Sequence, residues 1–172
     1  MKLQELGLPN FLEKNIELVI CANNKFIKKN KCSPLICYGL IHKKSQSIYA
    51  LKDLFNKPAW FAMKFINQMI NTMGMDGYIS SAEAATVAFE PGQSIQSYQE
   101  IIDKYGSLNS SPNKKDVFVI SVNLNGKKFV GMADMKTISK KKGTREIGEM
   151  TWTIETEASA IRGNLFDEEV TV

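Results

Sequence analysis

Apolar residues recur along this chain at two spacings, one typical of helices and the other typical of strands. Residues 11–23 carry apolar side chains at helical spacing, which predicts a helix there. Asn10 and Glu13 stand three residues apart, so each side chain can satisfy the other's free backbone N–H at the start of that helix. Asn23 and Asn24 predict its end, because asparagine tolerates the left-handed backbone found at helix termini.

Two further segments have helical spacing. Residues 57–73 carry Pro58 within the first turn and are followed by Gly74, and both residues suit helix ends. The apolar face of this segment is wide, so we expect its helix to be mostly buried. Residues 94–106, SIQSYQEIIDKYG, predict another helix that starts at a serine and stops at a glycine.

Strand patterns occupy much of the rest of the chain. An apolar run at 35–41, a polar break and a second run at 48–51 predict an N-terminal hairpin. The segment 79–90 has capping spacing for a short helix, but its branched and aromatic residues suit a strand, which we favour. Residues 106–115, GSLNSSPNKK, predict a polar loop.

The clearest strand signal surrounds the stretch SVNLNGKKFVGMADMK. A strand begins at Asp116, and the dipeptide Asn125-Gly126 suits the tight turn of a hairpin. Residues 127–138 form the predicted return strand, and the alternating segment 146–157 adds a third strand.

Together these elements predict a single α+β domain over residues 1–172. Its sheet is expected to be mainly antiparallel, with an N-terminal hairpin and a C-terminal three-stranded meander, and its helices are expected to pack on one face. The acidic tail 163–172 is expected to fray.

Composition is that of an ordinary globular domain. Of the 172 residues, 44% are hydrophobic and 23% are charged, which suffices for one sizeable core. The number of cysteines, three, is odd, and a chain of this size needs no disulfides. We therefore expect a reducing, cytoplasmic location. No secretion signal and no membrane-spanning apolar run is visible, which predicts a soluble protein with no membrane contact.

Charge is distributed unevenly along the chain. Residues 114–145 carry nine basic groups against two acids, and residues 146–172 carry one against seven. Such blocks either neutralise each other on a folded surface or leave a basic face for an anionic partner. We favour neutralisation, because surfaces of mixed sign are the common case.

The sequence lacks the residues and motifs that most catalytic and metal sites require. His42 is the single histidine, and Cys32 with Cys37 lacks the second pair that a thiolate metal site needs. Cys37 and His42 stand five apart on one predicted strand and would point to opposite faces. The motifs GxGxxG, GxxxxGK[ST] and GxSxG do not occur. We therefore expect no cofactor, no metal site and a protein that is not an enzyme.

One catalytic alternative lies on the predicted C-terminal hairpin. Asp134 and Lys136 share a strand face, and Asp116 opens the preceding strand. Two carboxylates and a lysine can hold a divalent cation and position a water for phosphodiester cleavage. This set resembles the Asp…(Asp/Glu)-x-Lys motif of restriction-type nucleases, with Glu100 as an extra acid. The resemblance implies a metal-dependent nuclease, although the helix expected after the second motif strand is not evident.

The same hairpin is similar to two other families. Its residues from Ser121 to Met135 resemble the S-V-N…G-x-F-x-G-x-A-(E/D)-M hairpin of YTH RNA readers, with one residue more in the turn. A looser similarity exists to the β-hairpin of acetyltransferases, but the Gly-rich acyl-CoA loop is absent. Because one segment fits three families, we assign the chain to none of them.

Nucleic-acid binding is the second alternative. The candidate contacts are the basic residues of the C-terminal half, namely Lys114, Lys115, Lys127, Lys128, Lys140, Lys141, Lys142 and Arg145. If they line one face, they would bind phosphates with an affinity that falls steeply with salt. The helix at 94–105 is net acidic and lacks arginine, which does not favour a winged-helix recognition element.

The leading hypothesis is a small binding or assembly module that acts through protein contacts, either with a protein partner or as a homo-oligomer. It follows from the missing reactive constellations, and from Trp152 and the acidic segment 146–172, which could meet a basic patch on a second copy. The alternatives are a nucleic-acid-binding protein and a metal-dependent nuclease.

Overall fold

The computed structural model describes residues 1–30, 37–55, 57–87, 96–107, 110–112, 114–139 and 141–155. The helices in these residues are α1 (Asn10–Asn30), α2 (Ala59–Met73) and α3 (Gln96–Tyr105), with the short 3₁₀ helices η1 (Leu3–Glu5) and η2 (Lys52–Leu54). The strands are β1 (Cys37–His42), β2 (Ser47–Ala50), β3 (Gly77–Val87), β4 (Lys114–Leu124), β5 (Lys127–Ser139), β6 (Thr144–Ile147) and β7 (Thr151–Ile154). The acidic tail 163–172 lies outside the described residues. No helix in the described ranges is long and apolar enough to cross a membrane.

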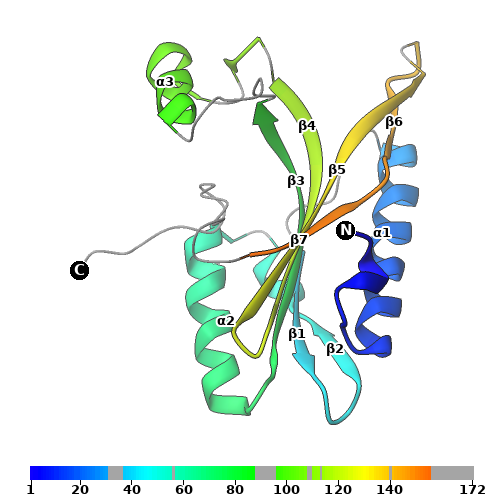
Figure 1. Cartoon of the computed structure of the whole chain (residues 1–172), viewed down its shortest axis with the longest axis vertical. Coiled ribbons are helices and arrows are strands. Elements are labelled where there is room, and N and C mark those ends of the chain that lie inside the picture. The colour runs from blue at the N-terminus through cyan, green and yellow to red at the C-terminus, as the bar shows by residue number, and fades with distance from the viewer. Residues whose placement is uncertain are drawn as a thin grey trace.

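The strands form one curled antiparallel sheet in the order β2-β1-β3-β4-β5-β6, and β7 also pairs with β5 (Figure 1). β3 and β4 have 11 residues each and pair along their whole length at the centre of the sheet. The predicted α+β class with an antiparallel sheet is confirmed.

Both predicted hairpins are present. β1 and β2 pair as the N-terminal hairpin, and β4 and β5 pair around the predicted turn. Asn125 and Gly126 have φ values of 51° and 79°, the left-handed backbone that a two-residue turn requires. The ambiguous segment 79–90 is a strand as far as Val87, where its described residues end.

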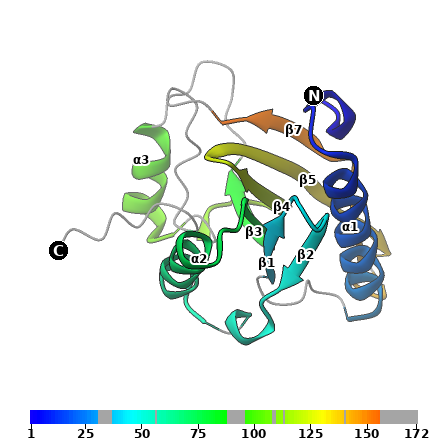
Figure 2. The ribbon, with the colours of Figure 1, turned by 90° about the horizontal axis from the view of Figure 1, so that it is seen from below.

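The sequence predicted that the helices pack on one face of the sheet, but α1 and α2 pack on opposite faces. Leu12 and Ile16 of α1 are fully buried in one core with Phe118 and Ile120 of β4. α2 belongs to a second core on the other side of the sheet, in which Ile66 is fully buried. Figures 1 and 2 show α1 and α2 on opposite sides of the strands. The prediction is wrong because the central strands carry apolar residues on both faces, and each face needs a cover.

α1 is longer than predicted and continues past Asn23 and Asn24. The Asn23 side-chain amide donates to the carbonyl of Val19 at 2.9 Å, within the helix. The Asn24 side-chain oxygen accepts the backbone N–H of Ile147 in β6 at 3.0 Å. Ile27, one turn further on, is fully buried. Contact with β6 therefore prolongs the helix beyond its local stop signal.

α2 is less buried than predicted. Gly74 ends it in the left-handed conformation expected from the sequence, with φ 65°. Ala62 is fully buried, but Trp60, Phe61 and Phe65 expose 48%, 40% and 41% of their surface. The sheet covers only a narrow stripe of the helix, so part of its wide apolar face remains on the molecular surface.

The predicted third strand of the C-terminal meander consists of two short strands. β6 pairs with the last residues of β5, β7 pairs with its first residues, and the chain between them starts at Gly148. Trp152 of β7 is only 1% exposed, and its indole lies so close over Gly131 that a Cβ there would be 2.7 Å from it. Trp152 is thus a core residue, and its predicted contact with a second copy is wrong.

Candidate functional site

Asp116 and Asp134, the carboxylates of the nuclease hypothesis, lie on opposite faces of the sheet. Asp134 stands directly opposite Val117 in the β4–β5 ladder, and residues so paired share a face. Asp116 precedes Val117 on the same strand and therefore points to the other face. The set Asp116, Asp134 and Lys136 does not converge on one ion, so the geometry gives the nuclease hypothesis no support.

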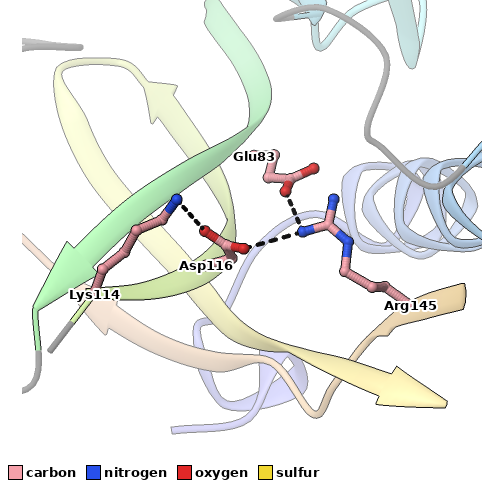
Figure 3. Close-up of polar contacts among 4 residues, drawn as sticks. All are labelled: Glu83, Lys114, Asp116 and Arg145. Carbon is pink, nitrogen blue, oxygen red and sulfur yellow. Dashed lines mark hydrogen bonds and ion pairs between the residues drawn. The ribbon is translucent and has the colours of Figure 1, made fainter. Parts of the chain in front are cut away.

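Asp116 belongs instead to an ion-pair network that joins three strands (Figure 3). Nη1 of Arg145 lies 3.2 Å from Oδ2 of Asp116 and 2.6 Å from Oε1 of Glu83. Nζ of Lys114 lies 3.2 Å from Oδ1 of Asp116. The Arg145 side chain, 20% exposed, faces two carboxylates, so the residue predicted to contact phosphate holds β3, β4 and β6 together.

The basic residues predicted to bind nucleic acid do not line one face. Lys127 and Lys128 begin β5, whereas Lys141 and Lys142 follow its end. β5 has 13 residues, which at about 3.3 Å per residue separates the two groups by roughly 40 Å of strand. Lys140 lies outside the described residues. Lys127 and Lys128 therefore lie at one end of β5, and Lys141 and Lys142 lie beyond the other.

A pocket of about 440 Å³ lies on the sheet face that carries Asp134. It forms beside β5 where β6 ends and β7 begins, and we call it the β5–β7 pocket. Its lining residues are Val130, Met132, Ala133, Asp134, Lys136, Gly148, Glu149, Thr151 and Thr153. The structure thus brings two of the three predicted catalytic residues together, but with Glu149 in place of Asp116.

Glu149 is the pocket residue that sequence reasoning missed. It follows Gly148, which lies between β6 and β7. Both of these strands pair with β5. The aliphatic stem of Lys136 passes across this glycine, because a Cβ at Gly148 would lie 3.0 Å from Cε of Lys136. A glycine that interrupts an alternating strand is the signal that could have indicated such a close approach.

The α2 surface offers a second candidate site. Trp60 and Phe61 meet edge to face, with ring centroids 5.8 Å apart and planes at 85°. Phe65 follows Phe61 by four residues and so lies on the same side of the helix. We call these three residues the aromatic flank. All three belong to α2 and remain partly in contact with solvent.

A polar group is buried on the α2 side of the sheet. Tyr78 is 5% exposed, and burial raises the pKa of its phenol, with a further rise from the Glu155 carboxylate and an opposing hydrogen bond with Asn123. Glu155 is also 3.4 Å from Nζ of Lys128. The hydroxyl oxygen of Ser80 is buried without a hydrogen-bond partner. The hydroxyl groups of Tyr78 and Ser80 therefore lie between layers of the fold and are not directly accessible to a partner.

The described residues offer little for metal or thiol chemistry. They contain no group of three or more His, Cys, Asp and Glu side chains that could hold a metal ion. Cys21 is exposed and Cys37 half-buried, and neither forms a disulfide, while Cys32 lies outside the described ranges. Burial raises the pKa of the Cys37 thiol more than its hydrogen bond with Ser81 lowers it. The thiol is therefore protonated at neutral pH and a poor nucleophile.

Comparison of the chain with protein-family models, curated proteins and solved structures found no match. Within the described residues, the β5–β7 pocket and the aromatic flank are surfaces with accessible side chains.

Proposed function

We propose that the protein is a non-catalytic binding module that acts through protein contacts and pairs with a second copy of itself through the aromatic flank of α2. The observation that carries this proposal is the exposure of Trp60, Phe61 and Phe65 on one helix. Aromatic residues are enriched at protein interfaces, because they bury a large area with few rotatable bonds.

The chemistry of α2 suits a copy of itself. Its sequence contains one charged residue, Lys64, and no acid, so two such helices meet with little electrostatic repulsion. Polar residues such as Asn67 and Gln68 can form the rim of the contact. A two-fold contact needs one surface that is complementary to itself, and offset or edge-to-face ring pairs satisfy this requirement.

The pairing is expected to be weak. Each half-exposed phenylalanine gains roughly 1 kcal/mol when its remaining surface is buried. Association also costs several kcal/mol of lost translational and rotational freedom. We therefore expect monomers at low concentration and dimers at high micromolar concentration.

Sedimentation velocity over protein concentrations from about 10 μM to 1 mM tests this proposal. The wild-type sedimentation coefficient should rise with concentration, and the double variant Phe61→Ser, Phe65→Ser should remain monomeric. The variant Leu18→Ser is the matched control, because it removes a leucine that is 65% exposed on α1. A wild-type monomer over the whole range, or a flank variant that still dimerises, would contradict the proposal.

A further inference from the structure

The β5–β7 pocket contains charges of both signs that are not paired with each other. Within the described part of the chain, the side chains of Lys136 and Glu149 form no ion pair or hydrogen bond, although both line the pocket. Asp134 lies 3.9 Å from Nζ of Lys115 and is partly neutralised by it. Among the described residues, Lys136 and Glu149 thus present one ammonium and one carboxylate without a partner, and the Asp134 carboxylate beside them is only loosely paired.

The floor of the pocket is apolar. Val130 stands opposite Thr153 and Met132 opposite Thr151 in the β5–β7 ladder, so these four side chains share one face. The Thr153 hydroxyl donates to the carbonyl of Val130 at 3.4 Å. The Thr151 side chain is exposed and leaves one hydroxyl for a ligand. The pocket has a volume of about 440 Å³ and is open to solvent, because the side chains of Lys136, Glu149 and Thr153 are exposed.

These features favour one class of ligand over others. A phosphate would meet two carboxylates, Asp134 and Glu149, at close quarters. A metal ion would find no third carboxylate, histidine or thiolate among the described residues. A small zwitterion offers a carboxylate to Lys136 and an ammonium to Glu149, and an apolar substituent on it would cover Val130 and Met132.

We propose that the β5–β7 pocket binds an amino acid with an apolar side chain. The Lys136 ammonium donates to the carboxylate of the ligand, and the Glu149 carboxylate accepts hydrogen bonds from its ammonium group. The side chain of the ligand packs against Val130 and Met132. This site is separate from the aromatic flank and does not depend on the proposed self-association.

Three probes of nearly equal size test which charges matter. L-leucine carries both groups, 3-methylbutylamine lacks the carboxylate, and 4-methylpentanoate lacks the ammonium. Titration of the ¹⁵N-labelled protein, followed through the backbone amides of Gly148, Glu149 and Thr151, gives a dissociation constant for each probe. We expect leucine to bind roughly tenfold more tightly than either analogue, because each charged contact contributes about a factor of ten.

Two variants assign each contact to its residue. Lys136→Met should make leucine bind no better than 3-methylbutylamine, and Glu149→Gln should make it bind no better than 4-methylpentanoate. Lys44→Met and Glu100→Gln, at exposed positions elsewhere, should leave the affinity unchanged. The amide spectrum of each variant also reports whether the fold is intact.

The possible results separate clearly. Amide shifts at the pocket with the expected ranking and the expected loss in each variant support the site. No shift with leucine, equal affinity for the three probes, or full affinity in both pocket variants would overturn the proposal.

Discussion

Tyr78 shows how one side chain couples this fold to pH. Its hydroxyl group lies on the α2 side of the sheet, where burial raises the phenol pKa, and the charges of Glu155 and Tyr38 raise it further, while a hydrogen bond with Asn123 lowers it. A pKa that is higher in the folded state than in the unfolded chain means that the neutral phenol stabilises the fold. This contribution is complete below the unfolded pKa of about 10 and is lost as the pH rises through the folded pKa.

The variant Tyr78→Phe should therefore flatten the alkaline loss of stability. Between the two pKa values, the phenol lowers the free energy of unfolding by up to about 1.4 kcal/mol for each pH unit. Urea unfolding at pH 8, 10 and 11 measures this slope for the wild type and for Tyr78→Phe. Tyr49→Phe, at a phenol that is 48% exposed, is the control. Equal slopes in wild type and Tyr78→Phe would exclude this role.

At the scale of elements, Arg145 determines how β6 is held against the centre of the sheet. Its guanidinium stands between Glu83 of β3 and Asp116 of β4, and all three side chains are partly shielded from water. Lys28 of α1 pairs with Glu146 of β6 at 3.0 Å and fixes the same strand from the helix side. The short strand β6 is thus joined by ion pairs to the central strands and to α1.

Replacing Arg145 by methionine should lower the free energy of unfolding by about 1–3 kcal/mol, because Glu83 and Asp116 would then repel each other. The double variant Arg145→Met, Glu83→Gln should lose less than the sum of the two single variants. Lys141→Met, at an exposed lysine, should change stability by no more than about 0.5 kcal/mol. Urea denaturation of the wild type, the single variants Arg145→Met and Glu83→Gln, and the double variant gives the coupling energy. Strict additivity would show that the network has no cooperative role.

The elements that the sequence predicted correctly are those set by local chemistry. Asn125 and Gly126 define the hairpin whatever surrounds them, and Gly74 ends α2 for the same reason. The length of α1 was not predictable from local signals, because Asn24 is held in the helix by Ile147, more than 100 residues later. Tertiary contacts of this kind override a helix stop signal.

The candidate site was only partly predictable. Lys136 and Asp134 share a strand face, and alternation alone indicates this. Whether Asp116 joins them depends on the register between strands, which places Val117 rather than Asp116 opposite Asp134. Glu149 lines the pocket because strand pairing with β5 is interrupted between Ile147 and Thr151. The alternation of a strand does not predict where a residue in such an interruption lies.

At the scale of the whole molecule, the N-terminal segment closes the core on the α1 side. Leu3, Leu6 and Leu8 are buried in the same cluster as Trp152. The carbonyl of Met1 accepts the backbone N–H of Trp152 at 3.0 Å. The first residues therefore cover one of the last described strands, and the two ends of the described fold should unfold together.

Leu6→Ala tests this closure. Loss of a buried leucine should lower the free energy of unfolding by about 2–5 kcal/mol, whereas Leu18→Ala, on the exposed side of α1, should change it by less than about 0.5 kcal/mol. In a Trp60→Phe background, Trp152 is the single tryptophan, and its fluorescence reports the core beside β7. Its unfolding curve should coincide with that of the far-ultraviolet circular dichroism, because the N-terminal segment and β7 belong to one cooperative unit. A loss below about 1 kcal/mol, or fluorescence that changes before the dichroism, would show that the segment packs as a detachable cover.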